Sequence, residues 1–197
     1  FMIGYSTTTG FGLYYFKYAF GDEGMYSIFA VILGVAQITA LAIFPVFSRK
    51  FNRRKLYTGA TIFVFAGYAV FFFSPMNMIF IGIAGLLLFL GQAFIQLLML
   101  MFFADTVEYG QWKLGKRNES VTFALQPFIN KMGGAIASGI VGATVIISGI
   151  NDAKSAADVT PGELLILKLA MFILPLLFII TEYLIYRFKY RIDQKMF

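Results

Sequence analysis

The chain has 197 residues, of which 59% are apolar and only 13% are charged, about half the charged fraction of a typical soluble domain. It lacks cysteine and histidine, which excludes disulfides, thiolate or imidazole metal sites, and catalysis by either side chain in these residues. The net charge of +6 lies in short islands between long apolar runs, a pattern that favours a membrane protein over one that binds nucleic acid.

Six apolar segments are each near or above the ~20 residues that cross a ~30 Å hydrocarbon layer as a helix. They cover residues 1–20, 26–47, 56–73, 78–103, 121–150 and 164–188. We therefore expect an all-α membrane protein whose single domain, residues 1–197, is a bundle of six transmembrane helices. The first segment begins in an apolar stretch without the layout of a signal peptide, so we expect the chain to be part of something longer.

Most of the 16 basic residues fall in alternate connections between these segments. They occupy residues 48–55, 104–120 and 189–197, whereas the intervening connections carry mainly acids. Basic connections tend to stay in the cytoplasm. We therefore predict a multi-pass protein of the cell membrane with loops 48–55 and 104–120, and the carboxy-terminal tail 189–197, on the cytoplasmic side.

Carboxamide side chains interrupt the fourth and fifth segments at similar depth. Gln92 and Gln96 are four residues apart, as are Gln126 and Asn130, so each pair lies on one face of its helix. Carboxamides offer donors and acceptors together, which suits the hydroxyl groups of a sugar. Hydrogen bonding between helices is the alternative interpretation, above all for Gln92. Pro127 lies beside this face and removes one backbone hydrogen bond there.

Lys131 is the charge expected deepest in the membrane. It follows the start of the fifth segment by ten residues, a depth of about 15 Å. An ammonium group there costs about 2.5–3.5 kcal/mol, so it should face an aqueous cavity or an acidic partner. No carboxylate of the chain is expected at matching depth, which leaves the substrate, the coupling ion or a group outside the chain. A structural ion pair between helices is the alternative.

Small residues recur every four positions later in the same segment, at Gly134, Ser138 and Gly142. Such a stripe lets a second helix approach closely. We therefore interpret it as a packing surface, with a surface on which helices slide as the alternative.

The connection after the fourth segment mixes acids and bases more densely than membrane topology requires. Residues 105–120 read DTVEYGQWKLGKRNES. Its charges at Asp105, Glu108, Arg117 and Glu119 predict ion pairs that act as a cytoplasmic gate. Pairs at a water-facing edge contribute only about 0–1 kcal/mol each, weak enough to break and re-form during a transport cycle.

With Gln126 and Lys131, this stretch resembles the glycoside-pentoside-hexuronide:cation symporters, a melibiose-permease-like family of the major facilitator superfamily. The resemblance implies a twelve-helix protein of two six-helix bundles, with this chain as the carboxy-terminal half. It implies symport of a sugar or glycoside with Na⁺ or H⁺, without catalysis or a cofactor. The coupling cation is then expected mainly in the amino-terminal six-helix half.

The same resemblance points to substrate contacts on the helices that flank the charged connection. These residues are Gln96, Gln126, Pro127, Asn130 and Lys131. The identity of the sugar does not follow, because Gln96, Pro127 and Asn130 differ from the residues of melibiose permease.

Three other functions would require sequence or structural features different from those of a sugar symporter. A facilitator transporter of a non-sugar substrate would show a wide apolar cavity in place of amide-lined walls. A polytopic membrane enzyme such as a prenyltransferase needs two acidic clusters for Mg²⁺ and diphosphate, and only the pair Asp105 and Glu108 is present. A structural or receptor role would not explain the energetic cost of a lysine placed at the membrane midplane beside amides.

Overall fold

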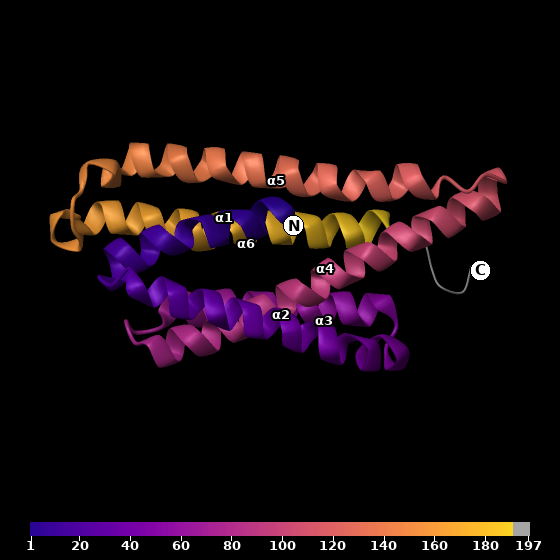
Figure 1. Cartoon of the computed structure of the whole chain (residues 1–197), viewed down its shortest axis with the longest axis horizontal. Coiled ribbons are helices and arrows are strands. Elements are labelled where there is room, and N and C mark those ends of the chain that lie inside the picture. Colours follow the sequence, from indigo (N-terminus) through magenta and orange to yellow (C-terminus); the bar gives the residue numbers. More distant parts are fainter. Residues whose placement is uncertain (191–197) are drawn as a thin grey trace.

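A computed structural model describes residues 1–190, where six α-helices run roughly along one long axis (Figure 1). The helices are α1 (Met2–Tyr14), α2 (Gly24–Lys50), α3 (Arg53–Phe73), α4 (Met78–Leu114), α5 (Glu119–Ser148) and α6 (Pro161–Lys189). A π-helix, η1 (Tyr15–Phe20), continues α1, and two 3-10 turns, η2 (Ile150–Asp152) and η3 (Ala156–Asp158), join α5 to α6. Most of the predicted tail, residues 191–197, lies outside the described residues.

Five of these helices, α2 to α6, are long and apolar enough to cross a membrane. The first predicted span is formed differently, because α1 has 13 residues and passes without a break into η1, which ends at Phe20. The expectation of an all-helical membrane protein with six helices is therefore confirmed, with five helices that each qualify as a span by themselves.

Local sequence sets the helix ends. The side chain of Asn52 accepts a hydrogen bond from the backbone N–H of Lys55 at 2.9 Å and so caps the start of α3, as expected of asparagine at an N-cap. Gly115 ends α4 with a φ of +66°, a left-handed conformation that glycine adopts without strain.

Two predicted loops are largely helical. Residues 104–114 continue α4, so only residues 115–118 separate α4 from α5. Residues 48–55 contain the end of α2 and the start of α3, and only residues 51–52 join them. A helix can continue through charged residues beyond the apolar segment. Hydropathy indicates whether a segment lies in lipid or in water and not whether its backbone is helical.

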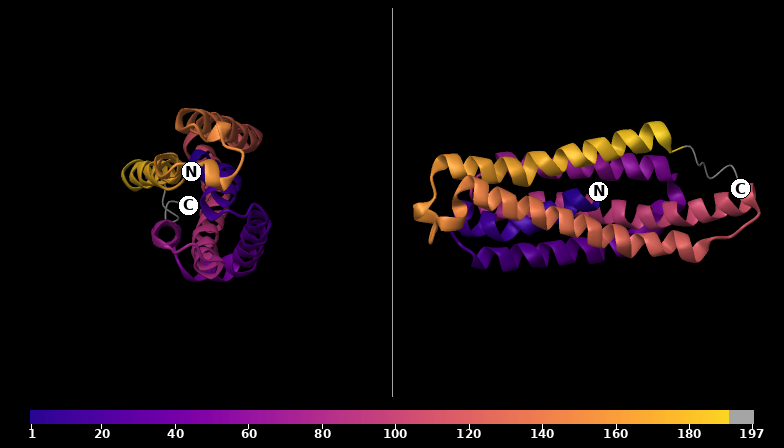
Figure 2. Two further views of the ribbon diagram at one scale, coloured as in Figure 1. Left: turned by 90° about the vertical axis from the view of Figure 1, so that its left-hand side faces the viewer. Right: turned by 90° about the horizontal axis from the view of Figure 1, so that it is seen from above.

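The helices pack as two interleaved triplets. The helix α4 packs against α2 and α3, and α1 packs against α5 and α6, an arrangement that can be followed end-on and from above in Figure 2. If α1, α2 and α3 are matched in order with α4, α5 and α6, the contacts of α4 with α2 and α3 correspond to those of α1 with α5 and α6. This is the packing expected of a three-plus-three structural repeat of the kind found in transporters.

Glycines allow the closest helix contacts. A Cβ atom on Gly67 would lie 2.6 Å from the backbone nitrogen of Leu88, so α3 and α4 meet almost backbone to backbone. A Cβ on Gly133 would lie 2.7 Å from the Cβ of Met2, which brings α5 against α1.

The predicted small-residue stripe lies on a different face of α5. Cβ atoms built on Gly134 and Gly142 would meet nothing within 4 Å, whereas Gly133, Ala137 and Val141 are buried. Within the described residues, the packed face is therefore one position away from the predicted one, and the stripe itself is left open.

Candidate functional site

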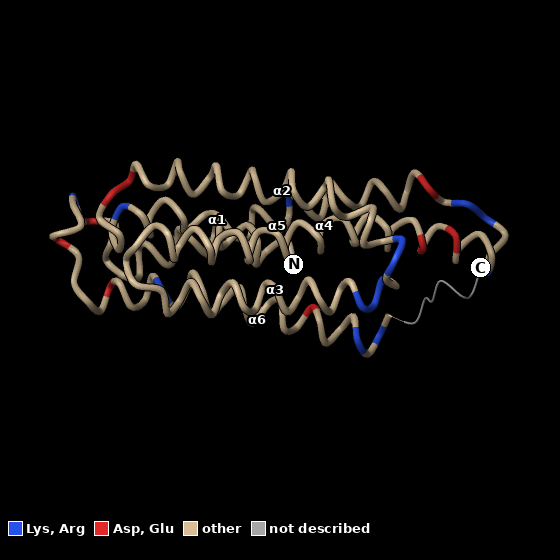
Figure 3. The backbone as a smooth tube through the Cα atoms, turned by 90° about the horizontal axis from the view of Figure 1, so that it is seen from below, with Lys and Arg blue, Asp and Glu red and all other residues tan. Residues whose placement is uncertain are grey.

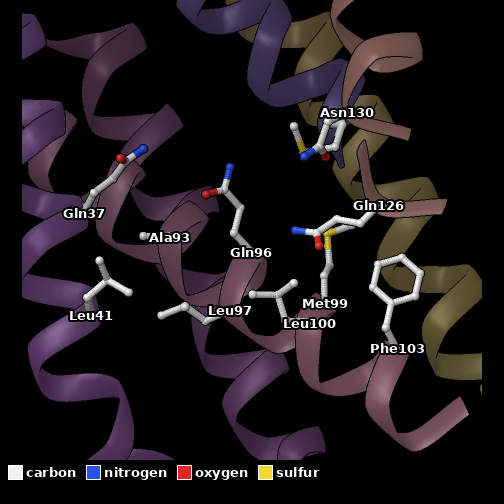
Figure 4. A pocket seen from close by; sticks show the side chains of 11 residues that line it. Gln37, Leu41, Ala93, Gln96, Leu97, Met99, Leu100, Phe103, Gln126 and Asn130 are labelled. Atoms are coloured by element: carbon white, nitrogen blue, oxygen red, sulfur yellow. The ribbon is translucent and has the colours of Figure 1, made fainter. Parts of the chain in front are cut away.

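A cavity of about 210 Å³ lies beside α4, between α2 and α5. Its polar lining consists of four carboxamide side chains, Gln37, Gln96, Gln126 and Asn130, and we call it the amide cavity. Figure 4 shows Gln96 between Gln37 on one side and Gln126 and Asn130 on the other. The remaining lining is apolar: Met2, Leu41, Ala93, Leu97, Met99, Leu100 and Phe103.

Three helices supply the four amides. Gln126 and Asn130 are one turn apart on α5, Gln96 comes from α4, and Gln37 comes from α2. Because α2 and α5 each pack against α4, the three helices form a shallow wall with amides projecting from it. Each carboxamide has one acceptor oxygen and two N–H donors, so this wall can bind a ligand rich in hydroxyl groups.

Sequence reasoning found three of these four residues. Gln96, Gln126 and Asn130 line one cavity, as their depth and spacing predict. Gln37 was missed, although it is the only carboxamide in the apolar segment 26–47. Its Nε2 donates a hydrogen bond to the Tyr5 hydroxyl at 3.1 Å, which ties α2 to α1.

Gln92 does not line the amide cavity. Its side chain is fully buried, and its Nε2 donates to the Tyr68 hydroxyl at 3.5 Å. The Tyr68 hydroxyl is in turn 2.5 Å from Oγ1 of Thr8, which donates to the carbonyl of Gly4 at 3.1 Å. This chain of hydrogen bonds joins α4, α3 and α1, which is the structural role considered for Gln92 as the alternative.

Lys131 and Pro127 lie on the outer surface of α5 beside the cavity. Both side chains are exposed in the described chain, and neither lines the cavity. Within residues 1–190, no carboxylate forms an ion pair with Lys131. Pro127 lies inside α5 and has no N–H to donate to the carbonyl of Phe123. The structure therefore places both residues next to the amides but not among them.

A second polar region lies at the end of the bundle where α2 turns into α3 and α4 connects to α5. Lys and Arg residues gather there (Figure 3), and we call it the basic end. The guanidinium of Arg53 on α3 pairs with the carboxylate of Asp105 on α4. The side chain of Arg53 is 20% exposed and that of Asp105 is 8% exposed. Nη1 of Arg53 also donates to the carbonyl of Met101 at 3.4 Å, and the Tyr190 hydroxyl donates to Asp105 at 3.4 Å.

The predicted gate residues therefore separate into different environments. Arg117 pairs with Glu119 at 3.0 Å, and both side chains are more than half exposed. Arg117 also donates to Oε1 of Gln111 at 3.4 Å. Glu108 is exposed and forms no ion pair in the described part of the chain. The partner of Asp105 is Arg53, which belongs to the basic run 48–55 from which the membrane topology was predicted.

Comparison with known proteins supports the same class of protein. Residues 1–194 match the model of a family described as MFS/sugar transport protein. The chain is 37% identical over 168 residues to the raffinose carrier protein of Pediococcus pentosaceus, covering 85% of this chain and 26% of that protein. It is 32% identical over 193 residues to a lactose permease of Leuconostoc lactis, covering 98% of this chain and 30% of that protein.

A more distant relative, the glucuronide carrier protein homolog of Escherichia coli, is 24% identical over 189 residues, covering 93% of this chain and 40% of that protein. The chain thus spans only a quarter to two-fifths of the length of these curated relatives.

Proposed function

Because the chain belongs to the MFS/sugar transport protein family and to its glycoside-pentoside-hexuronide branch, we propose that it forms the carboxy-terminal six-helix half of a sugar symporter. This family consists of multi-pass membrane transporters and not of enzymes. The complete protein would move a sugar or glycoside across the cell membrane together with Na⁺ or H⁺. The amino-terminal six-helix half would supply the opposite wall of the site.

The amide cavity carries this proposal. Gln96, Gln126 and Asn130 present donors and acceptors at one wall of a membrane bundle, where an unsatisfied polar group is costly unless it faces water or a ligand. Within the described residues, no charged side chain lines the cavity. The wall therefore suits an uncharged glycoside, whose hydroxyl groups can satisfy the amides one by one.

We assign the coupling cation mainly to the amino-terminal half. Among the described residues, the lining of the amide cavity contains no carboxylate, and Na⁺ and H⁺ both need an anionic or strongly accepting group. Lys131 stands beside the cavity at about half the membrane thickness, so we propose that its ammonium group responds to the charge of that cation site across the bundle interface. Pro127 would help to shape α5 at this depth.

The basic end is proposed to face the cytoplasm. Its basic residues belong to the connections that the positive-inside bias keeps inside the cell, namely residues 48–55 and 104–120. There, Asp105, Glu108, Arg117 and Glu119 would contribute to the inward gate, with Arg53 as the ion-pair partner of Asp105.

Uptake of labelled sugar by the full-length protein tests the proposal. Proteoliposomes under an imposed Na⁺ or H⁺ gradient should accumulate a neutral glycoside, and residues 1–197 alone should insert without accumulating it, because alternating access needs two bundles around one site. Failure of the complete protein to accumulate any mono-, di- or trisaccharide under either gradient would overturn the proposed function.

A further inference from the structure

We propose that Gln37, held by Tyr5, forms a second sugar subsite on α2, so that the transporter selects glycosides of at least two rings over single sugars. This inference rests on the proposed function, and it adds a residue and a size preference to the same site.

The position of Gln37 sets it apart from the other amides. Gln126 and Asn130 are one helical turn apart, about 6 Å along α5, a spacing at which one sugar ring can contact both. Gln37 lies beyond Gln96 on the opposite side of the cavity (Figure 4). Since α4 lies between the helices that carry these groups, and packed helix axes are about 8–10 Å apart, a ring bound at α5 leaves Gln37 to a second ring.

The hydrogen bond that Gln37 donates to Tyr5 orders its carboxamide for binding. Nε2 of Gln37 donates to the Tyr5 hydroxyl at 3.1 Å, which restricts the orientation of the carboxamide before a ligand arrives. A bond of this kind uses one of its two N–H groups, and its acceptor oxygen and second N–H remain available to hydroxyl groups in the cavity. Prior ordering of a flexible side chain lowers the entropy lost on binding.

Gln92 makes a similar hydrogen bond but serves only helix packing. Both glutamines donate to a tyrosine hydroxyl of another helix. Gln92 is fully buried and does not line the amide cavity, whereas Gln37 is only partly buried and lines its wall. The same bond therefore joins helices at Gln92 and positions a cavity-facing amide at Gln37.

Binding of two galactosides by the full-length protein tests the inference. Lactose has two rings, and methyl β-galactoside has only the galactosyl ring. Replacing Gln37 with alanine should raise the Kd for lactose about threefold to tenfold, as expected for one lost hydrogen bond, and leave the Kd for methyl β-galactoside unchanged. Tyr5→Phe removes the positioning hydroxyl. It should also raise the Kd for lactose, by a smaller factor, and leave the Kd for methyl β-galactoside unchanged.

Two further variants make the outcomes distinguishable. Gln126→Ala should weaken binding of both sugars, and Ile38→Ala should affect neither, because Ile38 is the next residue on α2 and is 70% exposed outside the cavity. If Gln37→Ala changes both sugars equally, or neither, while Gln126→Ala weakens both, the second subsite is wrong and the proposed function stands. If the unmodified protein binds no sugar, both fail.

Discussion

The amide cavity and the basic end are both polar, but they differ in whether their polar groups already have partners. At the basic end, Arg53 and Asp105 form an ion pair, the Met101 carbonyl and the Tyr190 hydroxyl add hydrogen bonds to it, and Nε of Arg53 is left without a partner among the described residues. In the cavity, Gln96, Gln126 and Asn130 project from separate positions into a common space. A buried ion pair between two helices stabilises one conformation, whereas an open set of neutral donors and acceptors can exchange partners with a ligand. The amide cavity is therefore suited to binding, and the Arg53–Asp105 pair to holding α3 and α4 together.

Lys131 is the sharpest test of this division, because it is a full charge beside the neutral cavity. We expect Lys131→Ala in the complete protein to abolish ion-coupled uptake while leaving membrane insertion intact, since a charge costing about 2.5–3.5 kcal/mol at this depth must be compensated by function or by a partner. Uptake in vesicles under an ion gradient measures the effect. Lys168→Ala is the matched control, a lysine of α6 outside the cavity. Normal accumulation by Lys131→Ala would remove Lys131 from the coupling mechanism.

Breaking the ion pair between Arg53 and Asp105 should mainly lower the stability of the fold. Asp105→Ala leaves the largely buried guanidinium of Arg53 without its carboxylate, and loss of one member of a buried pair costs about 3–5 kcal/mol. Thermal unfolding in detergent should show a clearly lower Tm. Glu108→Ala is the control on the same helix, because Glu108 is exposed and forms no ion pair within residues 1–190. The double variant with Arg53→Met should recover part of the loss, and a double variant no more stable than Asp105→Ala would argue against the pair.

Amide substitutions in the cavity should have the opposite signature. Gln126→Ala and Asn130→Ala should each weaken sugar binding by about 0.5–1.5 kcal/mol, the value of a typical hydrogen bond. Tm should change little, because both side chains line the cavity and neither is fully buried. Calorimetry with the full-length protein gives the affinity. Gln92→Ala provides the contrast, since its bond to Tyr68 is internal and its loss should lower Tm. Unchanged affinity in both cavity variants would place the sugar elsewhere.

The sequence predicted features that depend on local spacing. The i and i+4 relation of Gln126 and Asn130 placed them on one face of α5, and their depth matched that of Gln96 on α4. Six helices followed from apolar length alone. The end of α4 did not follow in this way, because the helix continues through charged residues until Gly115.

Features that depend on tertiary packing were not predictable in the same manner. Arg53 and Asp105 are far apart in sequence, and nothing local distinguishes Arg53 from the neighbouring basic residues until α3 and α4 are packed together. The buried face of α5 passes through Gly133 and not Gly134, because successive residues of a helix are rotated by about 100° and a stripe of small residues does not specify which partner it faces. Gln37 needed the position of α2 relative to α4 before it could be assigned to the cavity.

The smallest expected effect concerns the exposed ion pair at the basic end. Arg117 and Glu119 are 3.0 Å apart, with 56% and 55% of their side chains exposed, so solvent screening limits the pair to about 0–1 kcal/mol. A double-mutant cycle on Tm should give a small coupling energy for Arg117 with Glu119, and none for Arg117 with Asp105, because Asp105 is paired with Arg53 in this conformation. The cycle of Arg53 with Asp105 is the positive control. A coupling energy between Arg117 and Asp105 as large as that control would show that the ion pairs exchange partners. The charged groups of the basic end would then change partners as the amides of the cavity are expected to do with a ligand.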